Sequence, residues 1–126
     1  MGKTKELKES QILSDVVVKG LQELKGENIV HIDLSVVENA VCESFIICTG
    51  TSNTHVNALA RSVEREVRET LGEKPWKSEG FGNAEWIILD YVNTVVHIFQ
   101  EESRNFYNLD GLWADAKITK IEEGKS

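Results

Sequence analysis

Asp90 and His97 are the residues whose types and spacing come closest to a catalytic pair. They lie in two segments, residues 86–91 and 94–100, that are rich in β-branched and aromatic residues and separated by two residues, which predicts a β-hairpin. A two-residue loop fixes the register and makes Asp90 and His97 diagonal neighbours, roughly 7–8 Å apart at the backbone. A carboxylate beside an imidazole needs a nucleophile or a metal ion to do chemistry, and the sequence places neither. We therefore expect the two side chains to satisfy each other on a half-buried face rather than to catalyse a reaction.

The same register gives the hairpin two faces of different character. One face is apolar and is predicted to join the core: Ile87, Leu89, Tyr91, Val96 and Ile98. The other face mixes aromatic rings with polar groups: Trp86, Ile88, Asp90, Val95, His97 and Phe99. Aromatic residues flanked by a carboxylate and an imidazole have the composition of a binding hot spot. Packing of Trp86 beneath a C-terminal helix would explain the pattern equally well.

A second candidate site follows the apolar residues 45–48, where Gly50 begins a turn that leads into a helix pattern. Many proteins hold phosphate where a strand passes through such a turn into a helix N-terminus. If Ser52 is the N-cap, its hydroxyl bonds an amide near His55 and leaves other amides free for an anion. Thr51, Ser52 and His55 are therefore a candidate anion site, although structural capping accounts for the same residues.

Nucleotide-binding motifs do not accompany this turn. A Walker loop needs a lysine after the turn, and a dinucleotide fingerprint needs three glycines, of which Gly50 is the one present. Nucleotidyltransferases place paired metal-binding aspartates shortly after a comparable turn, whereas residues 53–55 here are Asn, Thr and His. The sequence thus predicts neither a metal site nor a cofactor.

Composition limits the class of partner and the compartment. The net charge of −7 opposes binding to nucleic-acid phosphates, so we expect no direct nucleic-acid site and, near RNA, a basic protein as the partner. No apolar run approaches the ~18 residues of a membrane span, and the first residues lack a signal core, which predicts a cytoplasmic protein that contacts no membrane. Cys42 and Cys48 would lie about 20 Å apart along one strand, too far for a disulfide. Two free thiols suit a reducing compartment.

The elements that must position these residues alternate between helices and strands. A first helix starts near Thr4 or Ser10 and ends at Gly26, and a second runs from residue 53 to Gly72. A short third helix is predicted over residues 101–107. The predicted strands are residues 29–34, 44–49, 76–78, 86–91 and 94–100.

This order, αββαβββα, predicts one mixed sheet of about five strands with helices packed on it, in the α/β or α+β class. We expect a single domain over residues 1–126, with its core from about residue 10 to residue 115. The first few residues and a charged tail over residues 116–126 are expected to be mobile. On the outer face of the second helix, Glu64 is expected to pair with Arg68 at the i,i+4 spacing.

Three segments taken together, residues 49–56, 86–91 and 95–113, resemble the ribosomal silencing factor family, also called the Iojap or RsfS proteins. The similarity runs from about Val16 to Asp115. Its most specific part is the C-terminal run, where hairpin, helix and the terminal Leu112 and Trp113 follow one another at fixed spacing. The resemblance implies a nucleotidyltransferase-like sheet without that chemistry, hence no enzymatic activity.

The resemblance also implies a function. Family members dock on the large ribosomal subunit through ribosomal protein fourteen, block joining of the small subunit and repress translation when nutrients are short; they form homodimers. By position, the partner-binding role falls to the mixed face of the hairpin and its edge: Trp86, Ile88, Asp90, His97, Glu102 and Arg104. An acidic protein would be steered toward a basic ribosomal protein.

The chain departs from the family at Val92, where members usually have Gly in the hairpin turn. A β-branched residue resists positive φ, so either the loop is longer or the register differs. Tyr107, Leu112 and Trp113 match the family, and we expect them to close the core.

Two other classes of function remain as alternatives. One is a degenerate nucleotidyltransferase or phosphohydrolase that uses Asp33, Asp90 and His97, and nucleotide binding would distinguish it. The other is an RNA-binding module, for which tight binding to naked RNA with a steep salt dependence would be the signature.

Overall fold

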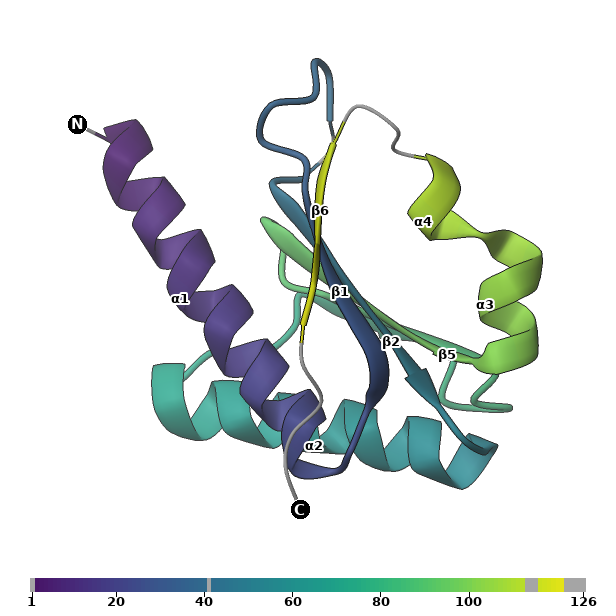
Figure 1. Ribbon diagram of the computed structural model, residues 1–126. Coiled ribbons are helices and arrows are strands. Elements are labelled where there is room, and N and C mark those ends of the chain that lie inside the picture. The colour runs from purple at the N-terminus through teal and green to yellow at the C-terminus, as the bar shows by residue number, and fades with distance from the viewer. Residues whose placement is uncertain (1, 41, 113–115, 122–126) are drawn as a thin grey trace.

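The computed structural model describes residues 2–40, 42–112 and 116–121, with side chains from residue 9 onward. Six strands form one mixed sheet in the order β3-β4-β5-β2-β1-β6 (Figure 1). Their bounds are β1 Glu27–Asp33, β2 Ser44–Gly50, β3 Lys77–Glu79, β4 Trp86–Asp90, β5 Thr94–Gln100 and β6 Lys117–Lys120. The predicted α/β class and the single mixed sheet are confirmed.

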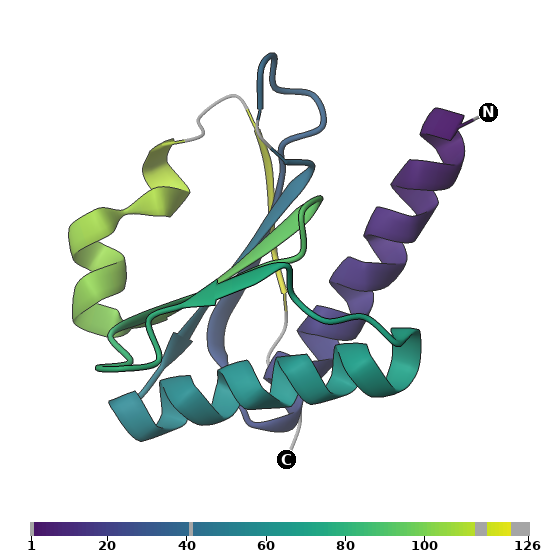
Figure 2. The same ribbon diagram turned by 180° about the vertical axis from the view of Figure 1, so that it is seen from behind.

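Helices cover both faces of the sheet. Two long helices, α1 (Gly2–Glu23) and α2 (Asn53–Leu71), cross on one face, and two short ones, α3 (Glu101–Tyr107) and α4 (Leu109–Leu112), lie on the other (Figures 1 and 2). Strand β2 lies between β1 and β5, and all seven of its residues are buried, as its apolar run predicted. Within the described ranges, no helix combines the length and apolarity needed to cross a membrane.

The crossing of α1 and α2 depends on a glycine. A Cβ on Gly20 would lie 3.0 Å from Cα of Val63 and 3.2 Å from the carbonyl oxygen of Ser62. The hydroxyl of Ser62 donates a 2.7 Å hydrogen bond to the carbonyl oxygen of Gly20. Close backbone approach therefore explains why a residue of poor helix propensity stands in the apolar stripe of α1.

The hairpin keeps the predicted two-residue loop and register, with Trp86 opposite Phe99 and Ile88 opposite His97. The turn accommodates Val92 at a φ of 75°, and the N–H of the next residue bonds back to the carbonyl of Tyr91 at 2.9 Å. This i to i+2 bond around a residue of positive φ is a γ-turn of the strained kind. The turn conformation is thus the one that suits glycine, and the sequence has valine.

Several expectations are wrong. The charged tail contains β6, which pairs antiparallel with β1 and raises the strand number from about five to six. Tyr107 and Leu112 do not close the core, because 47% and 65% of their surfaces are exposed; Trp113 lies outside the described residues. On α2, Glu64 pairs with Arg61 at 3.0 Å instead of with Arg68.

Candidate partner-binding surface

A row of four rings, here called the aromatic row, leads from the core to solvent on the side of the sheet that carries α3. Its members are His97, Trp86, Tyr107 and Phe106. Successive ring centroids are 5.9, 4.6 and 5.0 Å apart, which are ordinary distances for aromatic contacts. Exposure rises along the row: His97 is buried, Tyr107 is 47% exposed and Phe106 is 79% exposed.

Two elements bring the row together. Trp86 is the first residue of β4 and stacks on its cross-strand partner Phe99, with the ring centroids 4.9 Å apart. Helix α3 begins directly after β5, so the chain turns back over the sheet and places Tyr107 on Trp86. Asn108 ends α3 in the left-handed conformation, and its N–H bonds to the carbonyl of Arg104 at 2.8 Å.

The buried end of the row is fixed by a polar contact. The indole Nε1–H of Trp86 donates to Nδ1 of His97 at 3.1 Å, which places the ring proton of a neutral His97 on Nε2. Burial lowers the pKa of His97 to about 4, although the negative charge of Asp90 raises it in part. His97 is therefore neutral near pH 7 and serves as an acceptor that orients Trp86.

Asp90 and His97 do not satisfy each other, so this prediction is wrong. Oδ1 of Asp90 accepts the N–H of Val92 at 2.7 Å and stabilises the hairpin turn. Asp33, the third residue of the enzymatic alternative, lies on the opposite face of the sheet, in a pocket lined also by Gln11 of α1. The structure thus does not bring these three titratable groups into one site.

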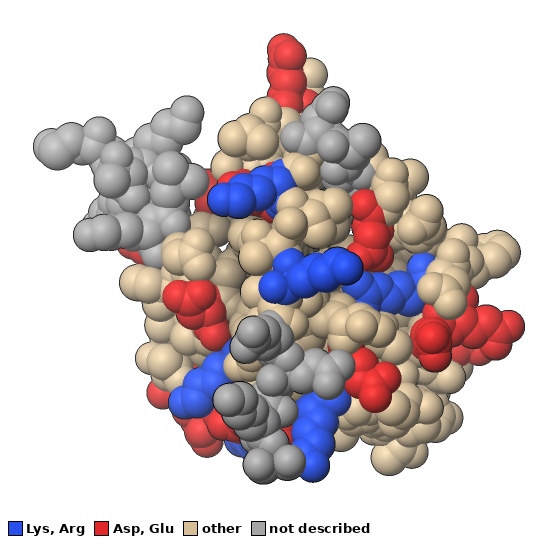
Figure 3. All heavy atoms as spheres, in the orientation of Figure 1, with Lys and Arg blue, Asp and Glu red and all other residues tan. Residues whose placement is uncertain are grey.

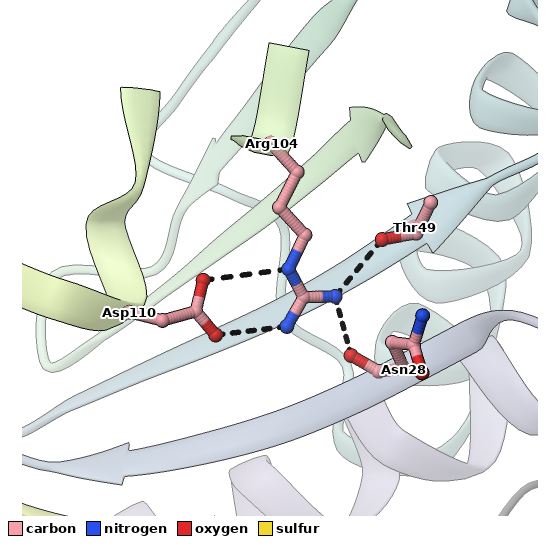
Figure 4. Close-up of polar contacts among 4 residues, drawn as sticks. All are labelled: Asn28, Thr49, Arg104 and Asp110. Carbon is pink, nitrogen blue, oxygen red and sulfur yellow. Dashed lines mark hydrogen bonds and ion pairs between the residues drawn. The ribbon is translucent and has the colours of Figure 1, made fainter. Parts of the chain in front are cut away.

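The side chain of Arg104, a residue of α3, points toward the sheet and ties α3 and α4 to it (Figure 4). Its guanidinium bonds both carboxylate oxygens of Asp110, at 3.4 and 2.9 Å, and the hydroxyl of Thr49 at 2.9 Å. A further bond runs to the carbonyl oxygen of Asn28. Only 12% of the Arg104 side chain is exposed, so this residue positions the two helices. It does not present its charge to a partner at the surface, which was its expected role.

The remaining residues of the predicted surface are more accessible. Ile88 is half-buried beside His97, and Glu102 is exposed. Glu102 lines a groove together with Glu27 and Glu101, next to α3. Acidic side chains gather on the surface over α3 in Figure 3. An acidic rim therefore adjoins the exposed end of the aromatic row.

The residues of the candidate anion site bond to one another. Ser52 is the N-cap of α2 and accepts the N–H of His55 at 3.1 Å, as predicted. The N–H of Thr51 donates to Nδ1 of His55 at 2.9 Å, and Nε2 of His55 lies 2.7 Å from the carbonyl oxygen of Leu24, the residue directly after α1. These contacts fix the Nε2–H tautomer of His55 and use two amides that an anion would need.

The exposed half of the aromatic row was missed at the level of sequence. Phe106 and Tyr107 are adjacent in a helix of seven residues, and neighbouring helical positions point about 100° apart. Both rings cannot therefore pack on one sheet, which was the available signal that at least one of them faces solvent.

Comparison with known proteins gives a consistent result. The family model described as "Ribosomal silencing factor during starvation" matches residues 7–126. The ribosomal silencing factor RsfS of Bacillus subtilis is 35% identical over 100 residues, which are 79% of this chain and 83% of that protein. The RsfS protein of Haemophilus influenzae is 38% identical over 106 residues, covering 81% of this chain and 98% of the relative. A crystal structure of a Chromobacterium violaceum protein has a TM-score of 0.78 at 29% identity, over 92% of this chain and 95% of that one.

Proposed function

Because the chain belongs to the ribosomal silencing factor family, we propose that it represses translation by binding the large ribosomal subunit, without catalysing a reaction. The partner on that subunit is ribosomal protein fourteen, and the bound protein prevents the small subunit from joining. It acts in the cytoplasm when nutrients are short, and it uses no cofactor.

The observation that carries this proposal is the aromatic row with its exposed end. Tyr107 and Phe106 offer apolar area to a partner, while Trp86 beneath them is held by His97 and cannot turn away. Rings that are fixed before binding lose little conformational freedom on binding, which favours affinity. Such a cluster is the usual centre of a protein–protein interface.

Charge supports a basic partner. Glu101 and Glu102 form the first turn of α3 and are exposed, close to the aromatic row on the same helix. Acidic groups at the rim of an interface accelerate association with a basic protein and discourage contact with phosphate-rich surfaces. A ribosomal protein that is basic meets both conditions.

The proposed mechanism is steric. A folded protein of 14.2 kDa that occupies the face of one subunit excludes another body from the same volume. Arg104 and Asp90 take part indirectly, because one holds α3 and α4 on the sheet and the other holds the hairpin turn. Contact with the partner then falls to Trp86, Ile88 and Glu102, together with the two exposed rings.

Sedimentation with purified large subunits tests the docking proposal. Phe106→Ala removes an exposed ring that supports no core contact, so the variant should fold normally yet bind at least about fivefold more weakly. Ile12→Ala, at an exposed apolar residue of α1 on the other face, is the matched control and should bind normally. Equal binding by both variants would remove the aromatic row from the interface.

We further propose that the free protein is a homodimer, as the family resemblance implies. Light scattering of the purified chain should then give twice the monomer mass of 14.2 kDa. A mass that stays at the monomer value at all concentrations would reject the dimer without affecting the docking proposal.

A further inference from the structure

A second pocket, here called the cationic pocket, lies away from the aromatic row. Its local charge is positive, whereas the net charge of the protein is negative. It lies between the second half of α2 and the segment that leads into β3, and it is lined by Arg61, Glu64, Arg68, Lys74, Pro75 and Ser78. Three cations and one carboxylate thus meet in one concavity of a chain whose net charge is −7.

The single carboxylate of the pocket is already engaged. Glu64 bonds Arg61 at 3.0 Å, and the guanidinium of Arg61 also lies 4.1 Å from the ring centroid of Phe81. Arg68 and Lys74 form no ion pair with any residue that the structure describes. Of the other acids close in sequence, Glu79 is paired with Lys77 at 3.1 Å, and Glu69 and Glu73 are exposed. Two cations of the pocket are therefore available to an anionic ligand.

An exposed indole stands beside these cations. Trp76 follows Pro75 of the pocket and is 74% exposed, although its backbone N–H is held by the carbonyl of Asp90 at 2.7 Å. It lies between two lining residues of the pocket, directly after Pro75 and two positions before Ser78, so that its backbone borders the pocket. A large apolar ring on a fixed backbone is thus presented to solvent next to unpaired positive charge.

We propose that the cationic pocket and Trp76 bind a single-stranded segment of RNA, with a base stacked on the indole and backbone phosphates on Arg68 and Lys74. Stacking on aromatic rings combined with phosphate contacts is how proteins hold single strands without reading their sequence. An acidic peptide would satisfy the cations but would leave the exposed indole face without a planar partner. The inference rests on the proposed function, because a protein docked on the ribosome is surrounded by RNA.

The overall negative charge makes this contact weak for the free protein and useful for the docked one. Repulsion from the acidic surface lowers the affinity for RNA in solution. Once the aromatic row is bound, RNA near the pocket is present at high effective concentration, so a weak second contact still lengthens the lifetime of the complex. The net charge of the whole chain predicts no nucleic-acid site, because it does not show that the charge of this one pocket is positive.

Titration of the whole protein with a single-stranded oligouridine at low salt, followed through the ¹H–¹⁵N indole signals, tests the proposal. The indole signal of Trp76, assigned with Trp76→Phe, should shift saturably, whereas that of Trp86 should not, since its N–H is bonded to His97. Arg68→Glu should weaken binding about tenfold. Arg65→Glu makes the same change on the α1 side of the same helix, where Arg65 lies 3.7 Å from Glu23, and should weaken binding far less.

Each outcome decides the matter. No shift of the Trp76 signal, or equal losses in the two charge-reversal variants, would overturn the proposal, as would an equal shift on adding poly-glutamate. The spectrum of each variant shows directly whether it is folded. Because the titration contains no ribosomal protein, its failure leaves the docking proposal intact, and failure of Phe106→Ala to weaken docking leaves the RNA contact intact.

Discussion

The side chains of Trp86 and His97 are joined by a 3.1 Å hydrogen bond from the indole Nε1 to the imidazole Nδ1. The bond requires a neutral imidazole, because a protonated Nδ1 cannot accept. The orientation of the aromatic row and the protonation state of one buried histidine are therefore linked.

Acid should destabilise the protein through His97. Burial holds the pKa of His97 at about 4 in the folded protein, against the ordinary 6.5. Above about pH 6.5, His97 is neutral in both the folded and the unfolded protein and does not lower the free energy of unfolding. As the pH drops from about 6.5 toward about 4, the unfolded chain binds the proton first, and the free energy of unfolding falls by up to about 3 kcal/mol. Urea unfolding of the wild type and of His97→Gln across this range measures the difference. Parallel pH profiles for the two proteins would contradict the assignment.

Val92→Gly should stabilise the protein by roughly 0.5–1 kcal/mol. Glycine adopts the φ of 75° without strain, and the exposed valine loses little packing; the gain is reduced by the greater freedom of glycine in the unfolded chain. Val36→Gly, at an exposed loop residue outside the positive-φ set, is the control and should destabilise. A lower urea midpoint for Val92→Gly would show that the turn is not strained.

Arg104→Lys should lower the free energy of unfolding by about 2 kcal/mol, despite retaining the charge. A lysine cannot bond Asp110 at two oxygens while also reaching Thr49 and the carbonyl of Asn28. Hydrogen exchange should accelerate first in α3 and α4, the helices that this residue fastens. Arg65→Lys, at a half-exposed residue, should change stability by less than about 0.5 kcal/mol. If lysine is tolerated at position 104, the four hydrogen bonds of Arg104 to Asp110, Thr49 and Asn28 are not what holds α3.

Gly20→Ala should destabilise by about 1 kcal/mol or more, even though alanine is the better helix former. Its Cβ would press on backbone atoms of α2 at 3.0–3.3 Å, which side-chain rotation cannot relieve. At Gly82 nothing lies within 4 Å of an added Cβ, so Gly82→Ala should be nearly neutral. A stabilised Gly20→Ala variant would mean that α1 and α2 can accommodate a Cβ at position 20 without a steric clash.

Much of the fold follows from residue patterns that are local. The helical stripe of α1, the Ser52 cap and Gly72 end of α2, and the hairpin register all emerge from spacing alone. Strand β6 does not, because its four residues are all exposed and its stability comes from pairing with β1. An exposed edge strand carries no alternation of apolar and polar residues to detect.

The candidate site was predictable in part. The register makes both Asp90 and Trp86 diagonal neighbours of His97. The expected partner of His97 was the carboxylate, and the actual partner is the indole. Burial favours the neutral pair of Trp86 and His97 over an ion pair. The carboxylate of Asp90 accepts the backbone N–H of Val92 in the turn instead. The side chain of Arg104 bonds to Asn28, which is 76 positions away in the sequence. No pattern in one sequence fixes so distant a contact.

The central claim is that the protein prevents subunit joining by occupying a surface through its aromatic row. Light scattering during the mixing of purified large and small subunits measures joining directly. Wild-type protein added to the large subunits first should reduce the joined fraction, and Phe106→Ala combined with Tyr107→Ala should restore it, while Ile12→Ala inhibits as the wild type does. Undiminished joining with wild-type protein, or equal inhibition by the double variant, would contradict the account.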